Sequence, residues 1–202
     1  MINHATLTKL SEVLSSNKIV WGVGGSFLLQ IYGLYANPND IDIWVRPSDM
    51  ARVKQLFKNY KEIETNINLP EEYHFKMNYY DLDVDFIACF IIKPNQNIFT
   101  YYISPKNIKT IKINEDLDIP CTYLEDWYII YKLLKRESKA AIIESVFKDK
   151  KIQLSDRVLE ASLKSAENLM PKKLIKDTHD LILHSTQLSL FDNYDKIEVN
   201  CK

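Results

Sequence analysis

The sequence predicts an α+β protein with a mixed β-sheet and flanking helices, followed by a helical C-terminal region. Two observations favour this class. Up to Thr122, short apolar or alternating segments typical of strands are interleaved with segments of helical periodicity. After Thr122 the strand pattern ends, and apolar residues recur at helical spacing. We therefore expect one domain over residues 1–120 and a helical region over residues 121–202.

The composition is typical of a folded protein. Of the 202 residues, 46% are hydrophobic and 11% aromatic, which is enough for an apolar core. No run approaches about eighteen apolar residues, and the N-terminus lacks the pattern of a secretory signal, so we expect a cytoplasmic protein. The three cysteines are odd in number and widely separated, which argues against a disulfide framework and a zinc site.

The net charge of −1 hides an uneven distribution. Residues 132–176 contain 12 Lys and Arg against 6 Asp and Glu. This basic segment could supply counter-charge for a nucleoside triphosphate or a nucleic-acid backbone. Lysines that only solvate helix surfaces would explain the excess equally well.

The helix and strand that open the chain lead into a glycine-rich turn. Residues 6–16 have apolar residues at helical spacing, with Thr6 as the expected N-cap. Residues 19–21 form a short apolar strand, after which Gly24, Gly25 and Ser26 mark the expected start of a second helix. The free N–H groups of a helix start attract phosphate oxygens, and glycine permits close approach of a ligand. A plain tight turn is the alternative.

Two aspartates follow this helix in a predicted strand over residues 40–45. Asp40 and Asp42 alternate with Ile41 and Ile43, which places both carboxylates on one face. Adjacent carboxylates repel each other unless a cation lies between them. The pattern therefore indicates a divalent metal ion opposite the phosphate-binding turn.

A later apolar strand, predicted over residues 82–92, carries Asp83 and Asp85 on one face. A carboxylate on such a strand is costly to bury unpaired, so we expect one of the two to join Asp40 and Asp42. Edge-strand charges that prevent aggregation are the alternative. Three carboxylates can hold two Mg²⁺ or Mn²⁺ ions about 3.5–4 Å apart and so promote an in-line displacement at phosphorus.

The remaining elements follow from the same periodicities. Ser48 is expected to cap a helix that extends to about Asn59, and Thr122 and Glu125 to form a capping box for a long helix. We also expect strands at residues 63–67, 73–79, 99–103 and 108–113, a closing strand at 119–121, and helices at 140–147, 154–170 and 174–184.

A few other side chains have possible roles. Tyr79, Tyr80 and Tyr128 could stack on a base or an acceptor ring. His74 shows no metal-ligand spacing, so we interpret it as structural, and we interpret Arg46 as a partner for a structural acid.

The motifs together resemble the polymerase-β-like nucleotidyltransferase superfamily. The resemblance comprises the Gly24-Gly25-Ser26 turn, the Asp40-Ile41-Asp42-Ile43 strand and an acid in a later apolar strand. Enzymes of this superfamily that adenylylate lincosamide or aminoglycoside antibiotics also resemble the chain in a segment like Ile119-Pro120-Cys121. The resemblance implies transfer of a nucleoside monophosphate from an NTP to a hydroxyl of an antibiotic-like molecule, with release of pyrophosphate.

Abortive-infection toxin nucleotidyltransferases are a second similar group. Their Leu-Glu-Asp segment and following Lys-Leu pair resemble residues 124–126 and Lys132-Leu133, which implies that Lys132 approaches the triphosphate. Alignment with the antibiotic enzymes places the third acid at Asp83 and alignment with the toxins at Asp85, and we favour Asp85. Nucleic acid or protein is then the alternative acceptor, and a non-catalytic, antitoxin-like regulatory protein is the alternative from another class.

The segment from Gln187 to Phe191 resembles the pentapeptide with which many bacterial replication and repair proteins bind the sliding clamp. A helix end that packs these apolar residues is the alternative.

Overall fold

The computed structural model describes residues 4–35, 37–65, 69–93, 98–115, 117–149, 152, 155–166 and 170–183. The chain divides into two compact units. One comprises Met1–Lys93 and Ile98–Tyr123, and the other Pro94–Asn97 and Leu124–Lys202. The predicted α+β class with a mixed sheet is confirmed.

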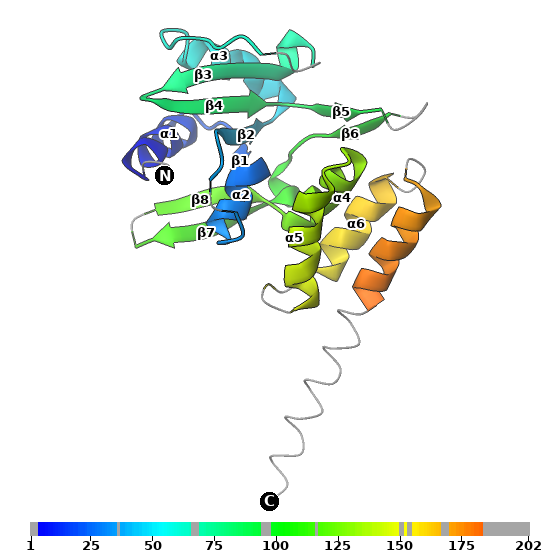
Figure 1. The fold of residues 1–202 in the computed structure, drawn as a ribbon. Coiled ribbons are helices and arrows are strands. Elements are labelled where there is room, and N and C mark those ends of the chain that lie inside the picture. The colour runs from blue at the N-terminus through cyan, green and yellow to red at the C-terminus, as the bar shows by residue number, and fades with distance from the viewer. Residues whose placement is uncertain are drawn as a thin grey trace, which may run out of the picture. The chain divides into compact units, whose positions relative to one another are not determined.

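A six-stranded sheet with the order β3-β4-β2-β1-β8-β7 forms the centre of the first unit (Figure 1). Strand β2 is parallel to β4 and antiparallel to β1, β1 is parallel to β8, and the outer pairs β3-β4 and β7-β8 are antiparallel. The strands are β1 (Trp21–Val23), β2 (Ile41–Val45), β3 (His74–Tyr79), β4 (Leu82–Ile87), β7 (Ile108–Asn114) and β8 (Leu117–Thr122). A separate antiparallel pair comprises β5 (Phe90–Ile92) and β6 (Phe99–Tyr101).

One face of the large sheet is apolar and buried. Ile41 and Ile43 of β2 lie beside Val84 and Phe86 of β4, and all four are fully buried. The ring of Phe57 stacks on Phe86 with centroids 5.4 Å apart. Because side chains alternate along a strand, the residues between them face the opposite side. The helices of this unit are α1 (His4–Ser16), α2 (Gly25–Ile31) and α3 (Met50–Leu56).

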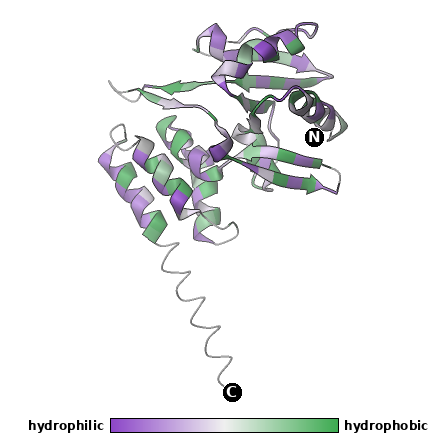
Figure 2. Cartoon of the chain, turned by 180° about the vertical axis from the view of Figure 1, so that it is seen from behind, coloured by the Kyte–Doolittle hydropathy of each residue, from purple (hydrophilic) through white to green (hydrophobic). Residues whose placement is uncertain are grey.

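The second unit is helical. It contains α4 (Leu124–Leu133), α5 (Glu137–Lys148), α6 (Asp156–Ala166) and a further helix over residues 172–183. Apart from α4, these helices carry both apolar and polar residues, as Figure 2 shows, which is the pattern of helices packed on one face. Every residue of α4 except Lys132 is buried. Among the described residues, no helix has the length and apolarity needed to cross a bilayer.

Two predicted helix caps are wrong. Thr6 lies inside α1, which already begins at His4. The residue before α3 is Asp49 rather than Ser48, because Pro47–Asp49 form a 3-10 turn. Thr122 ends β8, and its hydroxyl donates a hydrogen bond to the carbonyl of Val23 (2.9 Å), so the capping box with Glu125 stays a prediction.

The strand predictions also need correction. Residues 82–92 form two strands in different sheets, β4 and β5, and the strand predicted at 99–103 pairs with β5 instead of continuing the large sheet. Residues 63–65 form no strand, and the neighbouring Glu62 makes only an isolated bridge to Met77. Strand β8 does not close the sheet, because β7 lies outside it.

Candidate active site

Four aspartates lie on the face of the sheet opposite the apolar core. The parallel pairing of β2 and β4 places Asp42 directly beside Asp85. Asp40 and Asp83 precede them by two residues, so period-two alternation gives all four carboxylates the same face. Asp85 is 3% exposed, whereas the other three are partly exposed. The structure therefore brings together all the acids that the sequence analysis selected.

Helix α2 begins in direct contact with this group. Gly25 has φ of +60°, and a Cβ atom at this position would lie 1.7 Å from Oδ2 of Asp42. The N–H of Gly24 donates to the backbone carbonyl of Asp42 at 3.0 Å. Ser26, the second residue of α2, is partly exposed. The glycine turn and the aspartate strand thus approach so closely that position 25 has no room for a side chain.

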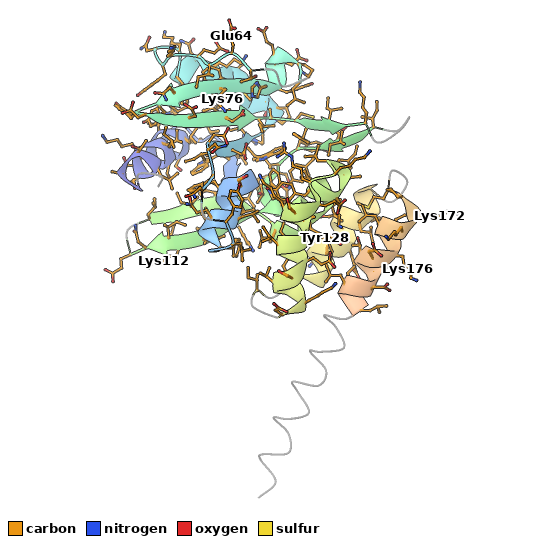
Figure 3. The ribbon with its side chains drawn as sticks, viewed as in Figure 1. Glu64, Lys76, Lys112, Tyr128, Lys172 and Lys176 are labelled. Carbon is orange, nitrogen blue, oxygen red and sulfur yellow. The ribbon has the colours of Figure 1, made fainter. Side chains whose placement is uncertain are left out.

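Strand β3 adds two basic residues that the sequence analysis missed. Lys76 Nζ donates to Oδ2 of Asp40 at 2.6 Å, and Nε2 of His74 lies 2.6 Å from Oδ1 of Asp85. Lys76 is labelled on β3 in Figure 3. The antiparallel register places Lys76 beside Asp85, on the acidic face. His74, which we interpreted as structural, is therefore a direct neighbour of a candidate catalytic acid.

Lys76 lies in a negative environment. Burial alone lowers the pKa of its ammonium group, but the hydrogen bond and charge of Asp40, with the charges of Asp85 and Asp83, outweigh this effect. The pKa of Lys76 is consequently raised above its ordinary value, and the side chain is charged at neutral pH. Asp83 in turn accepts a hydrogen bond from Nδ2 of Asn78 at 2.9 Å.

The acidic residues fit a divalent cation in their chemistry. Carboxylate oxygens are the ligands that Mg²⁺ and Mn²⁺ prefer, and the Lys76 ammonium shows that a cation already lies at Asp40. Within the described ranges, no three Asp, Glu, His or Cys side chains converge on one position as a metal would require. A metal ion at Asp40, Asp42 and Asp85 thus requires rotation of the side chains that now contact Lys76 and His74.

The residues that resemble the toxin motif belong to the helical unit. Lys132 Nζ lies 2.8 Å from Oε2 of Glu137. Glu125 is 2% exposed and its Oε1 accepts the N–H of Ser155 at 2.8 Å. Asp126 accepts a hydrogen bond from the hydroxyl of Ser162. Both acids of the Leu-Glu-Asp segment therefore stabilise the packing of α4 within its own unit.

Two of the three tyrosines proposed for ligand stacking are wrong candidates. Tyr79 and Tyr128 are 3% and 0% exposed, whereas Tyr80 is 59% exposed. The interpretation of Arg46 is confirmed, because its Nε lies 2.8 Å from Oδ2 of Asp49. The clamp-like segment from Gln187 to Phe191 lies outside the described residues.

Comparison with solved structures identifies the fold. ANT(2″)-Ia in complex with adenylyl-2″-tobramycin matches 81% of this chain and 97% of its own at 10% identity, with a TM-score of 0.51. The lincosamide antibiotic adenylyltransferase LnuA, bound to lincomycin, matches 72% of this chain and 98% of its own at 13% identity, with a TM-score of 0.48. A protein from Thermotoga maritima described as a nucleotidyltransferase matches 74% and 96% at 19% identity, with a TM-score of 0.49.

No protein-family model matches the sequence, and no curated protein sequence does so either. The assignment therefore depends on the three-dimensional likeness to ANT(2″)-Ia, in which nearly all of that chain is covered. The protein has the polymerase-β-like nucleotidyltransferase fold.

Proposed function

We propose that this protein is a metal-dependent nucleotidyltransferase that transfers a nucleoside monophosphate from an NTP to a hydroxyl of a small-molecule acceptor. The observation that carries the proposal is the placement of Asp42, which lies beside Asp85 in register and against Gly25 at the start of α2. Phosphoryl transfer depends mainly on positioning and charge stabilisation, and this arrangement offers ligands for a cation next to a turn that resembles a triphosphate-binding turn.

The proposed reaction forms a bond between the acceptor oxygen and the α-phosphorus and breaks the bond from that phosphorus to the leaving pyrophosphate. Asp85, which lies beside Asp42, would either complete the metal site or accept the proton of the acceptor hydroxyl. Asp40 and Asp42 would hold Mg²⁺ or Mn²⁺, and Gly24, Gly25 and Ser26 would hold the triphosphate. A bound divalent ion would neutralise charge on the phosphate oxygens.

Two further assignments belong to this proposal as alternatives. Asp83 replaces Asp85 as the third acid if the antibiotic enzymes are the correct guide. If the toxin enzymes are the correct guide, Lys132 contacts the triphosphate. Its ammonium group would then have to leave Glu137 and pair with a phosphate instead. The two groups of enzymes also imply different acceptors. The antibiotic enzymes imply a small molecule, whereas the toxin group implies a nucleic acid or a protein.

An antibiotic-like hydroxyl compound is the first acceptor class to test. The support for this choice is the likeness to ANT(2″)-Ia, whose structure contains an adenylylated tobramycin. We therefore propose a screen in which aminoglycosides and lincosamides are incubated with each common NTP and Mg²⁺ or Mn²⁺. Mass spectrometry of the acceptor would detect the added nucleoside monophosphate, and a coupled assay would detect pyrophosphate. Transfer RNA and whole-cell protein in the same screen would detect the toxin-type activity.

Asp42→Asn is the diagnostic variant. It should abolish product formation and leave folding intact, because the amide keeps the size of the side chain but loses the charge. Asp118→Asn is the matched control, since Asp118 is an exposed residue of β8 in the same sheet. Product formation by Asp42→Asn at the wild-type rate would contradict the proposed role.

A non-catalytic, regulatory role is the alternative that a specific observation favours. Lys76 and His74 already contact Asp40 and Asp85, as structural partners would. A protein of this kind would not bind NTP more tightly in the presence of Mn²⁺, and no acceptor would gain mass. Metal-dependent NTP binding by the wild-type protein would exclude it.

A further inference from the structure

We propose that Lys76 occupies the cation position at Asp40 and competes with a divalent metal ion for that carboxylate. In this account the metal binds only when the ammonium group moves away. The inference deepens the proposed function and rests on it in one respect, since it takes Asp40 as a metal ligand.

The register of three strands places Lys76 among the candidate ligands. Lys76 of β3 lies beside Asp85 of β4, which lies beside Asp42 of β2. The three residues therefore form one row across the acidic face. From this row Lys76 reaches Asp40, 36 residues away in sequence, with Nζ 2.6 Å from Oδ2. The contact thus joins an outer strand to the first acid of the proposed metal site.

The ion pair is partly shielded from water. The side chain of Lys76 is 16% exposed and that of Asp40 is 29% exposed. Exposed ion pairs contribute little because water and salt screen them, whereas shielding strengthens both attraction and repulsion. Removal of the ammonium group would leave Asp40, Asp42, Asp83 and Asp85 on one face with less positive charge to offset their repulsion.

A metal ion and the ammonium group cannot share this position. A divalent ion within ligand distance of Oδ2 would lie a few ångströms from Nζ, where two positive charges repel strongly in a shielded site. The flexible four-carbon stem of lysine lets the ammonium swing away, and the carboxylates of Asp40 and Asp85 can then rotate toward the ion. Lys76 therefore stabilises the acidic cluster when divalent ions are scarce and lowers the affinity of the site for them.

Direct measurement of Mn²⁺ binding tests the proposal without any assay of activity. Calorimetric titration and electron paramagnetic resonance of free Mn²⁺ would give the affinity of the wild-type protein, Lys76→Met and Lys76→Arg. Loss of the charge in Lys76→Met should tighten Mn²⁺ binding by about tenfold or more, equivalent to about 1.4 kcal/mol. Lys76→Arg keeps the charge and should remain near wild type.

Lys112→Met is the matched control. Lys112 is an exposed lysine of β7, at the other edge of the same sheet, and is labelled in Figure 3. The Lys112→Met substitution removes the same single charge as Lys76→Met, so a change in net charge alone would alter the Mn²⁺ affinity of both variants equally. We expect its Mn²⁺ affinity to equal that of the wild type.

Thermal unfolding provides a second readout. In EDTA, Lys76→Met should unfold at a lower temperature than the wild type, because the carboxylates repel one another. Saturating Mn²⁺ should raise its unfolding temperature by more than that of the wild type. Lys76→Gln, which retains a hydrogen-bond donor without the charge, should show the same two shifts and replaces Lys76→Met if that variant does not fold.

The outcomes separate this inference from the proposed function. Equal or weaker Mn²⁺ binding by both Lys76→Met and Lys76→Gln would overturn the inference. If wild-type binding is then lost in Asp42→Asn, the proposed metal site stands without it. Absence of Mn²⁺ binding in every variant would overturn the inference and the proposed function together.

Discussion

Gly25 is the residue where the glycine turn and the aspartate strand meet. Its backbone is left-handed, and any side chain would overlap the carboxylate of Asp42. Gly33 is also left-handed, with φ of +71°, but a Cβ atom there would have no neighbour within 4 Å. Substitution of Gly33 therefore measures only the cost of a left-handed backbone, whereas substitution of Gly25 adds the cost of overlap with Asp42.

We predict that Gly33→Ala lowers the free energy of unfolding by about 1–2 kcal/mol, the usual cost of a left-handed alanine. Gly25→Ala has the same cost and must also displace Asp42, so the loss should be larger. Urea unfolding of both variants gives the comparison. Gly25→Ala should also lose Mn²⁺-dependent NTP binding, whereas Gly33→Ala should keep it. Equal effects of the two substitutions on both measurements would mean that Gly25 has no special relation to Asp42.

Cys121 provides a prediction from ionisation. Burial raises the pKa of its thiol to about 12, although nearby Lys109 acts in the opposite direction. Only the thiolate reacts with alkylating reagents, so Cys121 should remain unmodified in the native protein at pH 8 and react in urea. Because the unfolded thiol ionises at lower pH than the folded one, its contribution to stability should be lost as the pH rises from about 9 to 12. Peptide mapping by mass spectrometry checks the labelling, and native labelling at pH 8 would contradict it.

The acids could be predicted from the sequence, but their basic partners could not. Alternation with isoleucine or valine gives each Asp-x-Asp pair its common face without any knowledge of the fold. The contacts of Lys76 and His74 depend instead on the register between β3 and β4 and on long side chains that cross strands. Lys76 and Asp40 are 36 residues apart in sequence, so no local sequence pattern predicts that their side chains form a hydrogen bond.

At the level of elements, the parallel pairing of β2 and β4 creates the site. The sequence predicts β4 and β5 as one continuous strand, because residues 86–92 contain no Gly, Pro, Asn, Asp or Ser to mark a turn. The strands separate at Ala88 and Cys89, which are both buried. A buried apolar run has the same composition whether it is one strand or two, so only tertiary packing fixes the break.

The connection from β2 to α3 depends on Asp49. This residue is 4% exposed and accepts hydrogen bonds from Arg46 (2.8 Å), Arg52 (2.9 Å) and the backbone N–H of Val20 (3.2 Å). It therefore links the end of the aspartate strand to α3 and to the segment before β1.

We predict that Asp49→Ala lowers the free energy of unfolding by about 1–3 kcal/mol, because the N–H of Val20 loses its acceptor. Asp118→Ala, an exposed aspartate in β8, should change the stability by less than about 0.5 kcal/mol. Chemical unfolding followed by circular dichroism measures both. A loss for Asp49→Ala no greater than for Asp118→Ala would show that these contacts contribute little.

For the whole molecule, the fold is shared with ANT(2″)-Ia at only 10% identity. The α+β class could be predicted because strand and helix periodicities are interleaved up to Thr122 and only helical spacing follows. The caps at Thr6 and Ser48 could not, because α1 begins earlier than the apolar pattern indicates and a 3-10 turn precedes α3.

Mn²⁺-dependent binding of NTP is the measurement that tests the central claim most directly. Titration of each common NTP into the wild-type protein should show saturable binding with Mn²⁺, much weaker binding in EDTA, and no Mn²⁺-dependent binding for Asp42→Asn. Asp118→Asn should behave as the wild type. NTP binding that is independent of Mn²⁺ and unchanged in Asp42→Asn, or no NTP binding to the folded wild-type protein, would contradict a nucleotide site at these aspartates.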